Sequence, residues 1–279
     1  MYYLQAFLLF FSFVHINIIT AQTPKGKLFI IGGGSRSDKL INQMLAVSPM
    51  QKKDYIVVLP MSSEEPDSAY IYFKKQVEKL TPNSIVMLNF DKNTNTNQKW
   101  LDSLSRAKLI FISGGDQNRF MKVVQNTAIA QTIKQAYQSG STIAGTSAGA
   151  AVMSGVMITG NQIQNSKYEE TFDNILFDNI ETAPGLALIN TAIIDQHFLK
   201  RSRYNRLLSA LITFPKLIGI GIDESTAIII SGNTARVVGE SEVIVVKKPK
   251  GIKKHKNNLV SVEKLQMSIY VEGQSFKIQ

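Results

Sequence analysis

The sequence predicts an α/β fold in which helices cover both faces of a mostly parallel sheet. Through the first half of the chain, short apolar segments rich in β-branched residues alternate with longer segments whose apolar residues recur at helical spacing. The short segments are apolar throughout, which is typical of parallel strands buried on both faces. With 279 residues, of which 44% are hydrophobic, the chain can bury a large core.

The first half of the chain supplies candidate strands and helices in alternation. The candidate strands are Lys27–Ile31, Tyr55–Leu59, Ser84–Leu88, Lys108–Ile112 and Ser141–Ala144. The candidate helices are Asp38–Ala46, Pro66–Leu80, Gln98–Arg106 and Gln117–Gln138. In an open sheet of this kind, functional sites form beyond the carboxyl ends of the strands.

The second half of the chain contains short strands separated by Gly, Asn and Pro turns. These candidate strands are Gly219–Asp223, Ala227–Ser231, Ala235–Val238, Glu242–Lys247 and Met267–Val271. We expect them to form a short antiparallel addition at one edge of the sheet, so that residues 22–279 make a single domain.

The first 21 residues have the pattern of a signal peptide. Ala6–Ile19 is a nearly continuous apolar run, and the small residues Thr20 and Ala21 that follow it suit cleavage. The run is too short to span a bilayer comfortably. A buried first strand is the alternative interpretation, but a polar linker follows the run directly. We therefore expect export to a periplasm or secretion, with no membrane attachment after cleavage.

Composition restricts the chemistry that the chain can perform. The absence of cysteine excludes a thiolate nucleophile, disulfides and Cys-ligated metals, and three histidines (His15, His197 and His255) argue against a His-rich metal site. The net charge of +10 raises the hypothesis of an anionic partner such as nucleic acid. However, Lys247–Lys256 supplies six of these charges without interleaved aromatic residues, which favours a solvated loop and no nucleic-acid binding.

A candidate nucleophile follows the strand that ends at Ala144. Gly145-Thr-Ser147-Ala-Gly149 matches the G-x-S-x-G pattern of a nucleophile elbow, in which glycines allow a sharp turn between a strand and a helix. The turn would expose the Ser147 hydroxyl, with the amide of Ala148 facing a developing oxyanion. A tight turn with a capping serine is the alternative interpretation.

A nucleophilic serine needs a base and an acid that orients the base. Without the leader, the candidate bases are His197, at the end of an apolar strand, and His255, within the lysine-rich segment; His197 is the better candidate. Asp195 is one candidate for the acid, but a residue two positions before His197 on the same strand rarely reaches the ring nitrogen of the histidine. Asp223 and Glu224 end another strand, and the residues alone leave both open.

Two further kinds of segment are expected at the same edge of the sheet. Ser113-Gly-Gly-Asp-Gln117 and Gly32-Gly-Gly-Ser35 each follow a strand and can bring backbone amides close to a ligand. Arg201, Arg203 and Arg206 crowd the start of an amphipathic helix after His197. They form either a solvated face or a site that recognises carboxylates through planar guanidinium groups.

Taken together, these segments resemble the cyanophycinase group of serine exopeptidases, which are related to aspartyl dipeptidase (peptidase E). The resemblance covers nearly all of the chain after the leader. The segments that carry it are GGG at 32–34, GGDQ at 114–117, GTSAGAAVMS at 145–154, DQHFLKRSRYNRL at 195–207 and GIGIDESTA at 219–227. It implies a flavodoxin-like, class I glutamine amidotransferase-like three-layer sandwich.

The resemblance also assigns roles to individual residues. It implies Ser147 as nucleophile, His197 as general base and Glu224 as the orienting acid, with an oxyanion hole from Ala148 and Gly115. The implied substrate-binding residues are Gln117, Asp195, Gln196, Arg201, Arg203 and Arg206, with the arginines facing carboxylates and Asp195 facing a cationic group.

The implied substrate is cyanophycin or an aspartyl peptide, hydrolysed without a metal or organic cofactor, and the implied assembly includes a homodimer. The alternatives are an aspartyl dipeptidase, another serine hydrolase on the same fold and an inactive relative that only binds.

Overall fold

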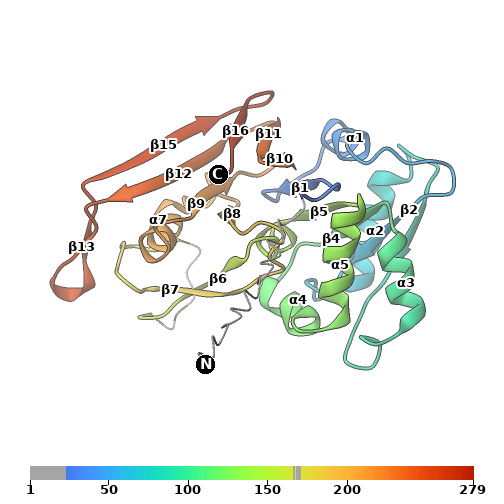
Figure 1. The fold of residues 1–279 in the computed structure, drawn as a ribbon, viewed down its shortest axis with the longest axis horizontal. Helices are drawn as coiled ribbons and strands as arrows, with labels where there is room; N and C mark the ends of the chain where they lie inside the picture. The colour runs from blue at the N-terminus through green and yellow to red at the C-terminus, as the bar shows by residue number, and fades with distance from the viewer. Residues whose placement is uncertain (1–22, 166, 168–170) are drawn as a thin grey trace, which may run out of the picture.

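The central sheet of the computed structural model has the strand order β16-β11-β10-β1-β5-β4-β2-β3 (Figure 1). The structure describes residues 23–165, 167 and 171–279, and the leader expected at residues 1–21 lies outside them. Five neighbouring strands are parallel, which confirms the α/β fold. They are β1 (Leu28–Ile31), β5 (Thr142–Thr146), β4 (Leu109–Ile112), β2 (Tyr55–Leu59) and β3 (Ser84–Met87).

Helices cover the two faces of this sheet, and consecutive strand residues alternate between them. Phe29 and Ile31 pack with α1 (Asp38–Ala46) and α2 (Pro66–Val77) on one face. Leu28 and Ile30 pack on the other face, where α3, α4 and α5 lie. These helices span Gln98–Arg106, Gln117–Val124 and Ala128–Ser139. The wholly apolar strands are therefore explained by burial on both sides.

The single helix expected over Gln117–Gln138 is wrong: two helices, α4 and α5, occupy this segment. Between them Asn126 has φ 59°, a left-handed conformation that ends the regular hydrogen bonding of the helix. The hydroxyl of Thr127 then accepts a hydrogen bond from the amide of Ile129 and caps the start of α5. The apolar spacing continues across this break, so periodicity alone does not reveal it.

The antiparallel addition expected at one edge of the sheet is present, but it holds only part of the expected strands, because the second half divides between two sheets. Three strands extend the central sheet antiparallel beyond β1: β10 (Thr226–Ser231), β11 (Thr234–Gly239) and β16 (Ser275–Lys277). A second sheet has the order β15-β12-β9-β8. Its strands are β8 (Ala192–Gln196), β9 (Ile218–Ile222), β12 (Val243–Lys250) and β15 (Lys264–Tyr270). Helix α7 (Tyr204–Thr213) packs on β9 and β12.

Smaller elements complete the part of the chain that the structure describes. The short helix α6 (Ala148–Ala151) follows β5, and β6 (Val156–Gln162) pairs with β7 (Ile180–Pro184) in a hairpin that the sequence did not predict. The lysine-rich segment includes β13 (Lys253–Lys254), which pairs with β14 (Val260–Ser261) and is exposed. None of the helices in the described ranges is long and apolar enough to cross a membrane.

Candidate active site

Ser147 occupies the sharp turn between β5 and α6. Its backbone has φ 53° and ψ −111°, a strained conformation for a residue with a side chain. The turn closes because glycines flank it: a Cβ on Gly145 would lie 2.3 Å from the carbonyl oxygen of Gly149. The amide of Ser147 donates to the carbonyl of Ile31 over 3.1 Å. The elbow expected from G-x-S-x-G is therefore present at the carboxyl end of β5.

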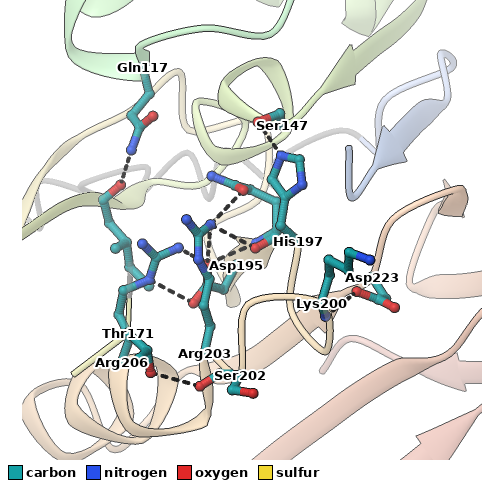
Figure 2. A network of polar contacts seen from close by, with 12 residues as sticks. Gln117, Ser147, Thr171, Asp195, His197, Lys200, Ser202, Arg203, Arg206 and Asp223 are labelled. Carbon is teal, nitrogen blue, oxygen red and sulfur yellow. Dashed lines mark hydrogen bonds and ion pairs between the residues drawn. The ribbon is translucent and has the colours of Figure 1, made fainter. Parts of the chain in front are cut away.

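A chain of hydrogen bonds joins the three side chains expected to be catalytic. His197 follows β8, and its Nε2 lies 2.8 Å from the hydroxyl oxygen of Ser147 (Figure 2). Its Nδ1 lies 2.6 Å from Oε1 of Glu224, which lies two residues beyond the end of β9. Serine comes from the central sheet, whereas histidine and glutamate come from the second sheet. The site is therefore built across the junction of the two sheets.

The geometry separates the two acids that the sequence left open. Oδ1 of Asp223 accepts hydrogen bonds from the amides of Leu199 (3.0 Å) and Lys200 (2.9 Å), and Oδ2 accepts one from the hydroxyl of Ser241 (2.8 Å). Asp223 therefore fixes the turn that follows His197, beside Lys200 in Figure 2. Glu224 contacts the imidazole directly.

The loop after β1 supports the turns that carry His197 and Glu224, the two candidate catalytic residues contributed by the second sheet. The carbonyl of Gly32 accepts a hydrogen bond from the amide of His197 over 2.7 Å, and the carbonyl of Gly33 accepts one from Ser225 over 2.9 Å. A Cβ on Gly33, which has φ 111°, would lie 2.3 Å from the imidazole ring. Any side chain there would displace His197. The glycines expected to approach a ligand thus pack against the base instead.

Burial lowers the pKa of His197 below its ordinary value of 6.5. The hydrogen bond from Nδ1 to Glu224 acts in the opposite direction and raises this pKa, whereas the positive charges of Arg201 and Arg203 lower it further. The net shift favours the neutral form of the imidazole. A neutral ring is the form that can accept a proton from Ser147.

Backbone amides near Ser147 can stabilise negative charge. Ala148 is the first residue of α6, and a helix leaves the amides of its first turn without intrahelical acceptors. Gly115, with φ 133°, lines the cavity beside Ser147, and the amide of the next residue, Asp116, donates to the carbonyl of Ser62 over 2.8 Å. The hydroxyl of Ser62 in turn bonds to Ser113. The two expected oxyanion donors therefore lie on rigid backbone.

A cavity of about 460 Å³ opens in front of Ser147. Most of the residues expected to bind substrate line it: Gln117, Gln196, Arg201, Arg203 and Arg206. The side-chain amide of Gln117 donates to the carbonyls of Ile158 and Thr159 over 3.1 and 2.8 Å, which ties α4 to β6. A volume of this size lies within the range of roughly 300–1,000 Å³ that small-molecule pockets occupy.

The role expected for Asp195, contact with a cationic group of the substrate, is wrong on geometric grounds. Asp195 is 1% exposed and does not line the cavity. Its carboxylate binds the guanidinium of Arg206 through both oxygens (Figure 2). A buried carboxylate needs such a partner, because an unpaired charge in the interior is costly. Asp195 therefore holds an arginine of the site and leaves no place for a substrate cation.

Two of the three expected arginines are part of the interior rather than a solvated face, whereas Arg201 is half-buried. Arg203 and Arg206 are each only 2% exposed. Arg203 donates to the backbone carbonyl of Gln196 over 2.8 Å and to its side-chain oxygen over 2.7 Å. Their guanidinium groups are therefore fixed along the cavity wall before any ligand arrives.

Sequence reasoning missed two contributions to the cavity. One is the bulge of β6, where Thr159, Gly160 and Asn161 stand opposite the single residue Glu181 and line the cavity. Only the glycine gives a local hint of this bulge. The other is Asp116, which lies within the GGDQ motif but to which the sequence assigned no role. It is the one carboxylate among the described residues that line the cavity.

A metal centre has no support in the part of the chain that the structure covers, since no group of three or more His, Asp or Glu side chains there is arranged to hold an ion.

Comparison with known proteins identifies the family. The family model described as peptidase family S51 matches residues 28–238. A cyanophycinase from Nostoc sp. is 32% identical over 238 residues, which cover 83% of this chain and 76% of that protein. A cyanophycinase from Synechococcus elongatus is 31% identical over 80% of this chain and 68% of its own length. The chain belongs to peptidase family S51. It is a serine-type peptidase.

Solved structures agree with the fold of the peptidase. A peptidase from an acI-B1 Actinobacterium superimposes with a TM-score of 0.67 at 21% identity, covering 90% of this chain and 96% of that one. A putative peptidase E protein from Listeria monocytogenes superimposes with a TM-score of 0.54 at 16% identity, covering 77% and 99%. At these identities the likeness supports the flavodoxin-like α/β architecture alone.

The contacts of Asp223 and Glu224 predict different consequences for the same chemical change. Glu224→Gln should lower kcat for peptide hydrolysis by about a hundredfold or more, because the neutral amide no longer stabilises the imidazolium or its orientation. Asp223→Asn keeps an oxygen for the two backbone amides and should cost less than about tenfold. Steady-state kinetics of both variants test this. Equal losses would show that Glu224 has no special role.

The lowered pKa of His197 predicts the acid side of the pH profile. Hydrolysis needs the neutral imidazole, so kcat/KM should fall only as the pH drops through the lowered pKa, with a midpoint below pH 6.5. Arg201→Gln removes a charge that lowers this pKa, so the midpoint should move to higher pH, whatever the effect on affinity. A wild-type midpoint above pH 6.5 would contradict the prediction.

Proposed function

We propose that this peptidase is a cyanophycinase-like serine exopeptidase that cleaves the aspartyl backbone of cyanophycin and releases β-Asp-Arg dipeptides. The observation that carries the proposal is the chain of hydrogen bonds from Ser147 through His197 to Glu224, placed at the mouth of an arginine-lined cavity. The similarity to cyanophycinases over most of the chain supports the choice of substrate.

The mechanism follows from the positions of these groups. Nε2 of His197 takes the proton of Ser147 as its oxygen attacks the scissile carbonyl carbon, and the amides of Ala148 and Gly115 stabilise the oxyanion. His197 then gives the proton to the leaving nitrogen, and the carbon–nitrogen bond breaks to leave an acyl-serine. Water attacks the ester as His197 takes its proton, and the imidazolium returns that proton to the Ser147 oxygen as the carbon–oxygen bond breaks and the acid is released. Glu224 stabilises the imidazolium in both steps.

The cavity suits the repeating unit of cyanophycin, in which arginine is attached to the side-chain carboxyl of each aspartate of the backbone. The α-carboxylate of that arginine stays free, and Arg201, Arg203 and Arg206 line the cavity with guanidinium groups that match carboxylates. Hydrogen bonds fix those of Arg203 and Arg206. The volume of about 460 Å³ suits a dipeptide-sized unit. Both properties favour removal of one unit at a time.

The guanidinium of each cyanophycin unit needs an acidic neighbour, and Asp195 is already bound to Arg206. We assign this role to Asp116, whose carboxylate is exposed at the cavity. Oδ1 of Asp116 accepts hydrogen bonds from the amides of Asn118 and Arg119 and caps α4. The helix therefore holds the carboxylate at the cavity that Arg203 and Arg206 also line.

Hydrolysis of insoluble cyanophycin tests the function directly. The purified peptidase should release soluble dipeptide, and Ser147→Ala should release none above background because the nucleophile is gone. Mass spectrometry of the product distinguishes β-Asp-Arg units from longer fragments. Equal release by both proteins would refute the serine mechanism. Activity of the wild type on aspartyl dipeptides but not on cyanophycin would support the peptidase E-like alternative.

The charge of Asp116 is tested by Asp116→Asn, which keeps the helix cap because asparagine caps as well as aspartate. Short cyanophycin-like oligomers would carry either arginine or its uncharged isostere citrulline. The wild type should have a higher kcat/KM for the arginine oligomer than for the citrulline oligomer. In the variant, the ratio of the two values should fall by about tenfold, because kcat/KM for the arginine oligomer drops while that for the citrulline oligomer changes little. An unchanged preference would mean that another group receives the guanidinium.

A further inference from the structure

The bulge of β6 brings the side-chain amide of Asn161 to the wall of the cavity at Ser147. Gly160 has φ 103°, a positive value that favours glycine, and the backbone amide of Asn161 donates to the hydroxyl oxygen of Thr159 over 3.3 Å. Thr159, Gly160 and Asn161 all line the cavity. A bulge is a common means of aiming a side chain at a site, and here it aims Asn161.

Glu181 of β7 fixes the orientation of the Asn161 side chain. Oε2 of Glu181 accepts a hydrogen bond from Nδ2 of Asn161 over 2.8 Å and another from the hydroxyl of Thr159. A carboxylate can only accept hydrogen bonds, so the NH2 group of Asn161 must face Glu181 and its Oδ1 must turn the other way. Asn161 lines the cavity and Glu181 does not. The end of the amide that meets a ligand is therefore its acceptor, Oδ1.

The bulge lies against the start of α4, which carries Asp116. The side-chain amide of Gln117 donates to the carbonyls of Ile158 and Thr159, and this holds α4 and β6 side by side (Figure 2). Asp116 caps α4 and lines the same cavity as Asn161. Two neighbouring elements thus present a carboxylate and an amide oxygen to one ligand.

A guanidinium group needs more acceptors than one carboxylate offers. It carries five N–H donors in a rigid plane and has no acceptor of its own. A carboxylate binds two of these donors in parallel. The donors that remain lose water when the group enters the cavity, and leaving them without a partner costs free energy. An amide oxygen on the neighbouring element can accept from one of them.

We propose that Asn161 is a specificity-determining residue for the arginine side chain of the substrate, and that Glu181 is a positioning residue that keeps Oδ1 of Asn161 turned toward it. This inference rests on the proposed function, since it gives a place to the arginine of each cyanophycin unit. Citrulline carries a carbonyl oxygen where arginine has an NH2 group. That oxygen meets an acceptor when Asn161 presents Oδ1, so the arrangement selects arginine against citrulline.

Glu181→Gln tests the positioning role. A glutamine can donate to Oδ1 of Asn161, so the amide becomes free to turn and present its NH2 group to the cavity. The ratio of kcat/KM for the arginine oligomer to that for the citrulline oligomer should fall by about fivefold, with the citrulline value unchanged or raised. Glu181 is exposed, so the melting temperature should stay that of the wild type.

Glu263→Gln is the matched control, because it makes the same change at an exposed carboxylate that pairs with Lys253 and does not line the cavity. It should leave both kcat/KM values unchanged. A purely structural role of Glu181 would lower the two values together in Glu181→Gln. An unchanged ratio in that variant would overturn the proposal.

Asn161→Ala shows whether Glu181 acts through the amide. Removal of Oδ1 should lower the ratio by about fivefold, and addition of Glu181→Gln to this variant should lower it no further, because the positioned group is already gone. Losses that add in the double variant would show that Glu181 acts on another group, and they would overturn the positioning role.

Binding to the inactive Ser147→Ala variant separates this inference from the proposed function. Calorimetry with the β-Asp-Arg dipeptide and with its citrulline analogue measures the same preference without turnover. A preference for arginine that Asn161→Ala and Glu181→Gln each reduce would support the inference. It would do so even if the wild type released no dipeptide from cyanophycin, a result that refutes the proposed function alone. Equal affinity for the two dipeptides, or binding of neither, would overturn the inference.

Discussion

The contact between the glycine loop after β1 and the turns after β8 and β9 is the constraint on which the site depends. Ser147 belongs to the central sheet, whereas His197 and Glu224 belong to the second sheet. The carbonyls of Gly32 and Gly33 bind the amides of His197 and Ser225, and this fixes one sheet relative to the other. The approach is close enough to bring backbone against the imidazole, which is possible only because residue 33 has no side chain.

Backbone strain is concentrated at the same junction. Ser147, His197 and Ser225 all have positive φ without being glycine, at 53°, 48° and 55°. Each such residue costs on the order of 1–3 kcal/mol and persists only where the surrounding structure enforces it. Here the strands on either side are fully buried, and Asp223 binds the turn that follows His197. The fold therefore offsets the strain and holds the hydroxyl, imidazole and carboxylate within hydrogen-bonding distance before substrate binds.

Buried charge gives the cavity its chemical character. Arg206 and Asp195 neutralise one another in the interior, and Arg203 is held by both oxygens that Gln196 offers. Fixed guanidinium groups lose little conformational entropy when a carboxylate binds. The positive charges of Arg201 and Arg203 also help to lower the pKa of His197, which favours the neutral base. Arg203 therefore both lines the cavity and favours the neutral form of the base.

The sequence alone determined the local features of this protein. Apolar runs and helical spacing located the parallel strands and most helices, the glycines around Ser147 located the elbow, and the scarcity of histidine left His197 as the better candidate base. Each depends on residues that are near one another along the chain.

Tertiary structure decided the division into two sheets and the roles of the acidic residues, because these depend on hydrogen bonds between distant segments and on burial. Only the pairing of strands could divide the second half between two sheets, and that division turns Glu224 rather than Asp223 toward the imidazole. Likewise, only burial shows that Asp195 serves Arg206, since a carboxylate taken from water binds the nearest cation in the fold. Local patterns carry no information about either choice.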